Sequence, residues 1–286
     1  MESGIRQSVI GSVALVLSLL SVGSWAADER SRFEGKLKNV ELCNGSDRNS
    51  PEPQINGCTA LIDAGNAPAM FLSIAHNNRG NAYSAKGDYD RAIEDYDLAI
   101  KLVPTYAKPT NNRGVAYLKK GEYDRAIKDF DEAIKLSPEY GSAFANRAET
   151  YQRKSDFERA ARDYDEAIRL EPDWQAVWNG RCWTRAVLGQ LQTALTDCNT
   201  ALRIKPGDAA TYDSRGLTYL KLNQFDSAIE DYNSALRSEP KLVSALYGRG
   251  LARLKKGDTS GGNTDLAAAR TIKATIADDF SRYGVR

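Results

Sequence analysis

The chain has 286 residues, with 39 lysines and arginines against 38 aspartates and glutamates, so its formal net charge is +1. This balance provides no electrostatic attraction for nucleic acid or an anionic membrane surface. A hydrophobic content of 42% is typical of a globular rather than a disordered protein. His76 is the single histidine, so most zinc and acid–base chemistry is disfavoured. We therefore expect no metal, no cofactor and no small-molecule substrate.

Residues 1–26 differ from the rest of the chain. Arg6 precedes an apolar run from Val9 to Leu20, and the small residues Ser24 and Ala26 match the pattern that signal peptidase cleaves. The run is shorter than the roughly 20 apolar residues of a membrane span. We predict a cleaved signal peptide and a periplasmic or secreted protein, without stable membrane insertion after cleavage. An uncleaved anchor is the alternative, because the basic region is thin.

Residues 27–72 form the next segment. Cys43 and Cys58 flank a polar loop rich in Asn, Ser and Pro, and the stretch from Gln54 to Ile62 has the pattern of a single helix. We expect this segment to cap the first face of the repeats that follow, because terminal caps of repeat arrays have altered sequences.

Residues 73–276 repeat with a period of 34, as six units: 73–106, 107–140, 141–174, 175–208, 209–242 and 243–276. Arginines, small residues, alanines, aspartates and prolines all recur at that step. The arginine series is Arg79, Arg113, Arg147, Arg181, Arg215 and Arg249. The aspartate series is Asp95, Asp129, Asp163, Asp197, Asp231 and Asp265.

Each unit divides into two helices. A glycine in the turn ends the first helix, as in "KGDYD" at residues 86–90, and an acidic residue helps to start the second. A proline after the second helix prevents its continuation in five of the units. One such hairpin cannot bury its apolar face alone, so we predict an all-α solenoid of stacked hairpins.

This pattern resembles the tetratricopeptide repeat, a 34-residue helix–turn–helix unit with small residues, alanines, an aromatic residue and a proline at set spacings. The resemblance is to exported bacterial members of that family. It implies a right-handed superhelix whose first helices line a concave groove for a partner segment. The chain departs from the family at the six arginines, where leucine is usual, and at Ala274, which replaces the last proline.

Carried over by repeat position, the resemblance also implies which side chains line the groove. The first three units would contribute Asn77, Asn81, Asn111, Asn112, Asn146 and Glu149, and the last three Trp183, Asp213, Leu217, Tyr247, Leu251 and Leu254. Amides can donate to and accept from a peptide backbone, and the apolar set suits a hydrophobic anchor. The alternative for Leu217 and Leu251 is packing between repeats. The carboxylate clamp of some family members is not expected, because Asn77, Ser142 and Asn146 replace its basic residues.

The arginine and aspartate of each unit are equidistant from its turn, so antiparallel helices place them side by side. We expect six structural ion pairs: Arg79–Asp95, Arg113–Asp129, Arg147–Asp163, Arg181–Asp197, Arg215–Asp231 and Arg249–Asp265. Anion receptors are the alternative, disfavoured because a binding site rarely needs six copies.

Cys182 and Cys198 stand eight residues on either side of Gln190, so they should face each other across the fourth hairpin. Helix axes about 8–10 Å apart leave facing Cα atoms roughly 4–6 Å apart, which a disulfide can bridge. For an exported chain we predict the pairs Cys43–Cys58 and Cys182–Cys198, among three connectivities. Two small reduced core residues remain the alternative for Cys182 and Cys198.

The remaining residues, 277–286, are predicted to be a capping tail. Ile272, Ile276 and Phe280 recur every four residues and suggest one apolar helix face. The sequence "GDTSGG" at residues 257–262 resembles a serine-protease motif only superficially, because it lies in a turn far from His76. We therefore predict a non-enzymatic scaffold or adaptor that binds an unknown protein or peptide. A structural spacer or assembly factor of an envelope complex is the alternative.

Overall fold

The computed structural model describes residues 27–45 and 50–285. The predicted signal peptide, residues 1–26, lies outside them. Every regular element in the two described ranges is an α-helix, and no strand occurs there. None of these helices is both long and apolar enough to cross a membrane.

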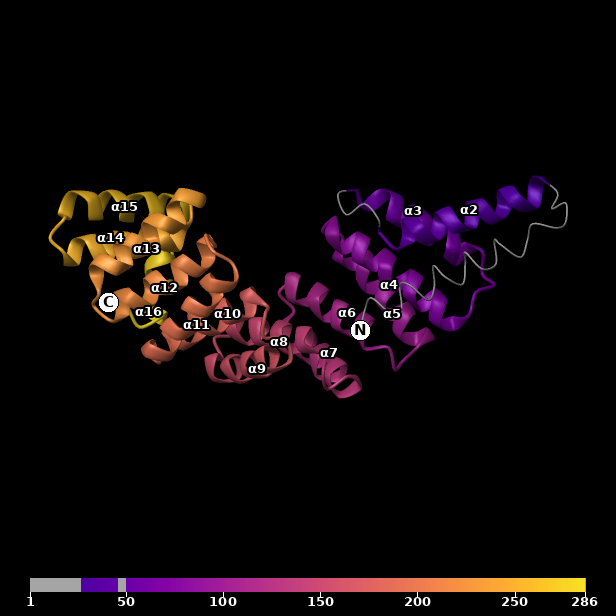
Figure 1. Ribbon diagram of the computed structural model, residues 1–286, viewed down its shortest axis with the longest axis horizontal. Coiled ribbons are helices and arrows are strands. Elements are labelled where there is room, and N and C mark those ends of the chain that lie inside the picture. The colour runs from indigo at the N-terminus through magenta and orange to yellow at the C-terminus, as the bar shows by residue number, and fades with distance from the viewer. Residues whose placement is uncertain (1–26, 46–49, 286) are drawn as a thin grey trace.

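The helices pack as successive antiparallel hairpins, which stack along an arc into an α-solenoid (Figure 1). The first helices of the six repeat units are α4 (Ala69–Ala85), α6 (Ala107–Lys119), α8 (Gly141–Arg153), α10 (Gln175–Val187), α12 (Ala209–Lys221) and α14 (Val243–Lys255). The second helices are α5 (Tyr89–Leu102), α7 (Tyr123–Leu136), α9 (Phe157–Leu170), α11 (Leu191–Ile204), α13 (Phe225–Ser238) and α15 (Thr259–Ile272).

The turn inside each hairpin requires one residue with a left-handed backbone. Four units place a glycine there, with φ between 77° and 86°: Gly87, Gly121, Gly189 and Gly257. The third and fifth units have Ser155 and Asn223 instead, with φ of 60° and 58°. A residue with a Cβ adopts this backbone conformation at a cost of about 1 kcal/mol, and the cost is lowest for asparagine. The turn of the third hairpin, which has Ser155, is therefore the most strained of the six.

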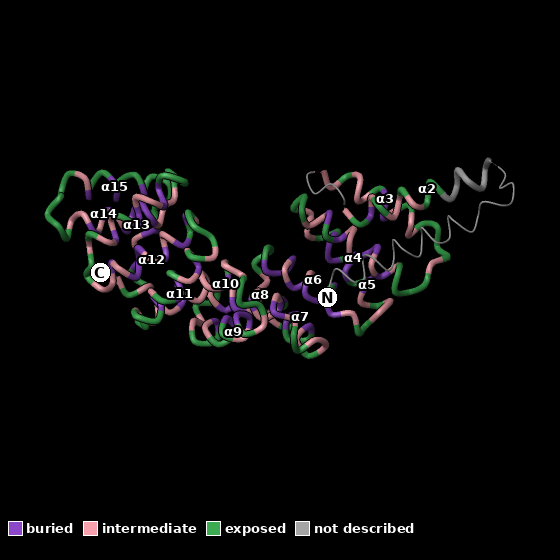
Figure 2. The backbone as a smooth tube through the Cα atoms, viewed as in Figure 1, coloured by how far each residue is buried: buried purple, intermediate pink, exposed green. Residues whose placement is uncertain are grey.

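The cores of the first and second hairpins are built from one glycine facing one aromatic ring. A Cβ added to Gly80 would lie 2.7 Å from Tyr96 Cε1, and one added to Gly114 would lie 2.7 Å from Phe130 Cε1. Atoms do not approach so closely without a shift, so glycine lets the ring lie directly against the opposite helix in these two units. The buried residues follow the arc from end to end between the two layers of helices (Figure 2).

The N-terminal segment is a complete hairpin, α2 (Ala27–Cys43) and α3 (Pro51–Asp63), and α3 packs on α4. The helix expected between Gln54 and Ile62 is present as α3, but the expectation that it is a single helix is wrong, because α2 pairs with it. The sequence of α2 is strongly polar and lacks an apolar periodicity that would reveal a helix. The Sγ atoms of Cys43 and Cys58 are bonded at 2.04 Å and join the two helices.

The C-terminal helix α16 (Ile276–Arg282) does not continue the stack of hairpins but packs on α14. The predicted apolar face is wrong at Ile272, which is the last residue of α15 and is 49% exposed. Lys273 leaves the helix with an extended backbone, and the chain changes direction there. Only Ile276 and Phe280 are buried.

Candidate functional site

All six predicted arginine–aspartate pairs are present, each with two hydrogen bonds. The Nε and Nη2 atoms of the arginine donate to the two carboxylate oxygens at 2.7–2.9 Å. The aspartates are at most 7% exposed, and they lie between the two helices of their unit. Both oxygens of each carboxylate are occupied, so the pairs stabilise the hairpins and leave no open anion receptor.

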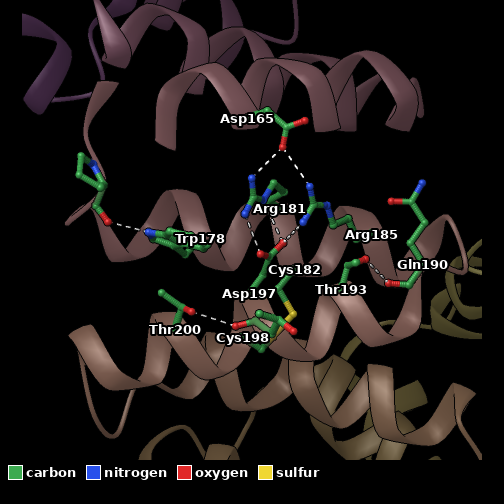
Figure 3. Close-up of polar contacts among 12 residues, drawn as sticks. Asp165, Trp178, Arg181, Cys182, Arg185, Gln190, Thr193, Asp197, Cys198 and Thr200 are labelled. Atoms are coloured by element: carbon green, nitrogen blue, oxygen red, sulfur yellow. Dashed lines mark hydrogen bonds and ion pairs between the residues drawn. A yellow bond between two sulfur atoms is a disulfide. The ribbon is translucent and has the colours of Figure 1, made fainter. Parts of the chain in front are cut away.

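A third contact of these arginines was missed by sequence reasoning. From the second unit onward, the Nη1 atom donates to an oxygen on the second helix of the preceding unit. These acceptors recur at the same step of 34: Asp97, Asp131, Asp165, Asn199 and Asn233. Each guanidinium therefore joins three helices. Figure 3 shows Asp165 between Arg181 and Arg185, which both also contact Asp197.

His76 has a structural partner as well. Its Nδ1 lies 2.8 Å from Asp95 Oδ1, and the histidine is 8% exposed. Burial acts to raise the pKa of the Asp95 carboxyl, but hydrogen bonds from His76 and Arg79 outweigh it, and the pKa lies below its usual value. Asp163 has no histidine beside it, and burial raises its pKa despite the pairing with Arg147.

In the fourth unit, a disulfide occupies the place of the small residue and the aromatic ring. Cys182 and Cys198 have Cα atoms 5.3 Å apart and bonded Sγ atoms, and both are fully buried (Figure 3). No free cysteine remains in the described chain. The disulfide thus joins α10 to α11 where the first, second, third and fifth units pack an aromatic ring and the sixth packs Leu266.

The asparagines predicted for the groove form a hydrogen-bonded series across the first three units. Asn112 Nδ2 donates to the Oδ1 atoms of Asn77 and Asn81 at 3.0 Å, and Asn146 Nδ2 donates to Asn111 Oδ1 at 3.0 Å. Asn77 and Asn111 are buried, so they serve the stacking of units and do not face a partner. Asn81 is exposed, while Asn112 and Asn146 are partly exposed.

The predicted apolar groove residues are less accessible. Leu217 and Tyr247 are 4% and 6% exposed, in the same core cluster, and Leu251 packs against that cluster. Leu254 faces Gly262 inside the sixth hairpin. Packing between repeats, the alternative stated for Leu217 and Leu251, is what the structure shows.

The C-terminal segment covers this half of the groove. The rings of Tyr283 and Trp183 lie edge to face with centroids 5.0 Å apart, and those of Phe280 and Tyr247 lie 4.8 Å apart. Lys221 Nζ donates to the carbonyl oxygen of Tyr283 at 2.6 Å. The segment from α16 to Tyr283 therefore lies on the first helices of the last three units, and the sequence analysis did not foresee it.

Two adjoining hollows remain between the first helices and this segment, with volumes of about 730 and 530 Å³. Trp183 and Asp213 line both of them, together with Leu242, Lys273, Asp279 and Tyr283. The second hollow also reaches Glu149 on α8. Ser244 Oγ donates to Asp213 at 2.6 Å, and burial raises the pKa of Asp213 to about 7.

The described residues contain no group of three or more His, Cys, Asp or Glu side chains suited to a metal ion. The polar groups that line the hollows are instead carboxylates, lysine and arginine side chains, amides and hydroxyls, beside aromatic rings. This arrangement suits noncovalent contact with another molecule through hydrogen bonds and ring surfaces.

Family models place the chain among known repeat proteins. Models of the TPR repeat match residues 80–121 and 216–257, and models of the tetratricopeptide repeat match residues 107–140 and 145–209. Together these matches span more than half of the sequence. The chain belongs to the tetratricopeptide repeat family. No curated protein sequence matches it significantly.

Solved structures of other tetratricopeptide repeat proteins have the same fold. YrrB, a TPR protein with an unusual peptide-binding site, is 23% identical over 67% of this chain and 97% of its own, with a TM-score of 0.54. A tetratricopeptide repeat protein from Parabacteroides merdae is 16% identical over 87% and 99%, with a TM-score of 0.65. The APC/C hetero-tetramer Cut9–Hcn1 is 16% identical over 86% and 51%, with a TM-score of 0.67. At these identities the likeness establishes the fold.

Tetratricopeptide repeat proteins are generally non-enzymatic interaction modules that bind proteins or peptides. This chain is accordingly a protein–protein interaction scaffold.

Proposed function

We propose that the chain is a non-enzymatic adaptor of the periplasm or secreted space that binds a segment of a partner protein on its first helices. The observation that carries this proposal is the continuous hollow surface from Glu149 on α8, past Trp183 on α10, to Asp213 on α12. It mixes aromatic rings with polar groups, as the centres of protein interfaces do. The likeness to YrrB, which has a peptide-binding site, agrees with it.

The chemistry of the chain supports an adaptor rather than an enzyme. His76 is buried against Asp95, away from the groove, so it is not positioned as a general base there. Export is supported by the cysteines, since all four are paired and disulfides persist in oxidising compartments. The apolar run at residues 9–20 would direct that export.

A structural spacer is the second candidate, and one observation favours it. Each repeated guanidinium joins three helices from the second unit onward, for example Arg181 on α10 with Asp197 on α11 and Asp165 on α9. Ties of this kind stiffen the stack of units, and stiffness is what a spacer requires.

Site-specific photo-crosslinking separates the two candidates. A photoreactive phenylalanine is placed at Asn81 or Glu149 on first helices, and as matched controls at Lys101 and Glu132, exposed positions near the ends of second helices. The adaptor proposal expects the same partner band from both groove positions and none from the controls. Crosslinks from the control positions alone would overturn it in favour of a spacer.

The location is tested by the mass of the mature protein from the periplasmic fraction. Cleavage after Ala26 gives a chain that begins at Ala27 and is found with other periplasmic proteins. An intact chain recovered in the membrane fraction would instead indicate an uncleaved anchor.

A further inference from the structure

Two oxygen-bearing side chains in the groove have few donors from the protein. The Oδ1 atom of Asn179 is buried and has no hydrogen-bond partner among residues 34–45 and 50–285. Asp213 accepts one hydrogen bond, from Ser244 Oγ, and no lysine, arginine or histidine nitrogen of the described chain forms an ion pair with it. Both residues line the hollow of about 530 Å³. A buried acceptor without a donor is costly, so the Asn179 oxygen points to a ligand that supplies one. The partly exposed carboxylate of Asp213 lines the same hollow and can accept further hydrogen bonds from that ligand.

The other two carboxylates that line this hollow, Glu149 and Asp279, already have cationic partners. Asp279 is paired with Lys273 at 2.5 Å and with Arg282, and Glu149 is paired with Arg153 at 3.3 Å. Glu239 and Lys241 are exposed at the rim and carry opposite charges. The charged and titratable groups that line the two hollows with Asp213 are Glu149 and Arg153 from α8, Tyr164 from α9, Glu239 and Lys241 from the rim, Lys273, and Asp279, Arg282 and Tyr283 from the C-terminal segment. Among the three carboxylates of the hollow of about 530 Å³, Asp213 alone forms no ion pair with a nitrogen of the described chain.

Aromatic rings line the same space. Trp183 comes from α10 and Tyr283 from the C-terminal segment, and both rings line both hollows. The faces of tryptophan and tyrosine rings attract cations, with tryptophan the stronger. Lysine and arginine side chains have only donors, so either can satisfy both Asp213 and Asn179 without adding another acceptor.

We propose that the hollow lined by Asn179, Trp183, Asp213 and Tyr283 holds a cationic side chain, lysine or arginine, of the bound partner segment. The proposal rests on the function proposed above and names the chemistry that the groove recognises. Charge complementarity selects the residue type, because a neutral or acidic side chain would leave the carboxylate of Asp213 unpaired. The volume also leaves room for the residues flanking the cation, so the occupant is a segment of chain rather than a free amine.

The affinity should depend on pH in a defined direction. A cation binds the ionised form of Asp213, whose pKa in the free protein is raised by burial to about 7. Below that pH, the Asp213 carboxyl must lose its proton before it can pair with the cation. The affinity for the cationic segment therefore rises as pH increases. We expect binding about tenfold weaker at about pH 6 than at about pH 8.

The test uses two peptide arrays that differ at one fixed central position, lysine in one and acetyl-lysine in the other, with all flanking positions varied. The probe is the mature exported chain with its C-terminal segment intact. We expect about tenfold stronger retention on the lysine array at about pH 8, and loss of this preference in Asp213→Asn. Glu239→Gln is the matched control, since it removes the same charge from an exposed residue of the adjoining hollow of about 730 Å³ and should keep the preference.

The outcomes separate this inference from the function on which it rests. Equal retention on both arrays, reduced equally by Glu149→Trp in the groove, would overturn the cation site and leave groove binding intact. If Asp213→Asn and Glu239→Gln lose the lysine preference equally, that preference reflects a general attraction between opposite charges. This result would also overturn the specific site at Asp213. No retention on either array would count against both proposals.

Discussion

The first three repeat units and the last three share one scaffold but present different surfaces. The sixth position of each unit changes from asparagine, in Asn78, Asn112 and Asn146, to Gly180, Ser214 and Gly248. A Cβ at Gly180 would lie 2.6 Å from Tyr164 Cζ, and one at Gly248 would lie 2.3 Å from Tyr232 Cζ. At these two glycines, the ring of the preceding unit occupies the space that a side chain would take. The repeated amide surface of the first three units is therefore absent from the last three, where aromatic rings and charged groups line the groove, while the arginine–aspartate pairs stay constant.

The largest expected effect is the loss of stability when an arginine–aspartate pair is broken. It tests whether these pairs stabilise both halves of the solenoid equally. Arg147→Ala and Arg215→Ala each leave a buried aspartate, Asp163 or Asp231, without its bidentate partner. We expect each to lower the free energy of unfolding by about 3 kcal/mol, measured by urea denaturation. Arg91→Ala removes an exposed arginine paired with Asp88 and is the control, which should leave the free energy of unfolding nearly unchanged. An unchanged midpoint in Arg147→Ala or Arg215→Ala would show that the arginine–aspartate pairs do not stabilise the stack.

These pairs also show what the sequence could predict. Arginine and aspartate meet within one hairpin, at a spacing that repeats in every unit, so the antiparallel geometry and the phase locate them. Asp97 and Asp131 repeat at the same step, and their contacts with the next unit could have been found by asking which second helix lies beside each arginine.

The position of the C-terminal segment could not be predicted in this way. The contact of Tyr283 with Trp183 joins residues far apart in sequence, and no other unit repeats it. The polar helix α2 was missed for a related reason, because helix formation there depends on packing against α3 and on the bond from Cys43 to Cys58 rather than on its own pattern.

The second prediction concerns the disulfide of the fourth unit, at the boundary of the two halves. Replacing both Cys182 and Cys198 by alanine should lower the free energy of unfolding by about 3 kcal/mol in the chain-entropy model. Cys182→Gly with Cys198→Tyr should recover part of the loss, because it recreates the packing of Gly216 against Tyr232 in the fifth unit.

Thermal unfolding of the two double variants, compared with the wild type, measures this difference. Intact-mass analysis after alkylation checks whether both disulfides are formed. We expect no free thiol in the native protein. Four alkylated thiols would contradict both disulfides.

The third prediction separates the covered half of the groove from the open half. Phe280→Ala removes the ring that lies 4.8 Å from Tyr247, and we expect a loss of about 2 kcal/mol, at the low end for a buried ring because the segment can detach. Detachment would uncover Trp183 and shift tryptophan emission to longer wavelength. Ile272→Ala, an exposed apolar residue at the end of α15, is the control and should change neither signal. Unchanged emission in Phe280→Ala would mean that the segment does not cover Trp183 in solution.

The fourth and smallest effect is that of Asp213 on stability. Its raised pKa means that the folded protein holds a proton that the unfolded chain releases between about pH 4 and pH 7. The stability contribution of Asp213 therefore falls as pH rises through that range. Asp213→Asn should be more stable than the wild type by about 1–2 kcal/mol at about pH 8, with the difference shrinking towards about pH 4.

Melting temperatures across this pH range measure the effect, with Glu239→Gln as the exposed control that should follow the wild type. A difference between Asp213→Asn and the wild type that stays constant with pH would show that Asp213 does not titrate in this window.

Photo-crosslinking of the chain in its native cell, with mass-spectrometric location of the attached sites, tests groove recognition, the central claim, most directly. The account predicts that partner attachments fall on the first helices α4 to α14 and on α16. Attachments confined to the second helices α5 to α15 would contradict recognition by the groove.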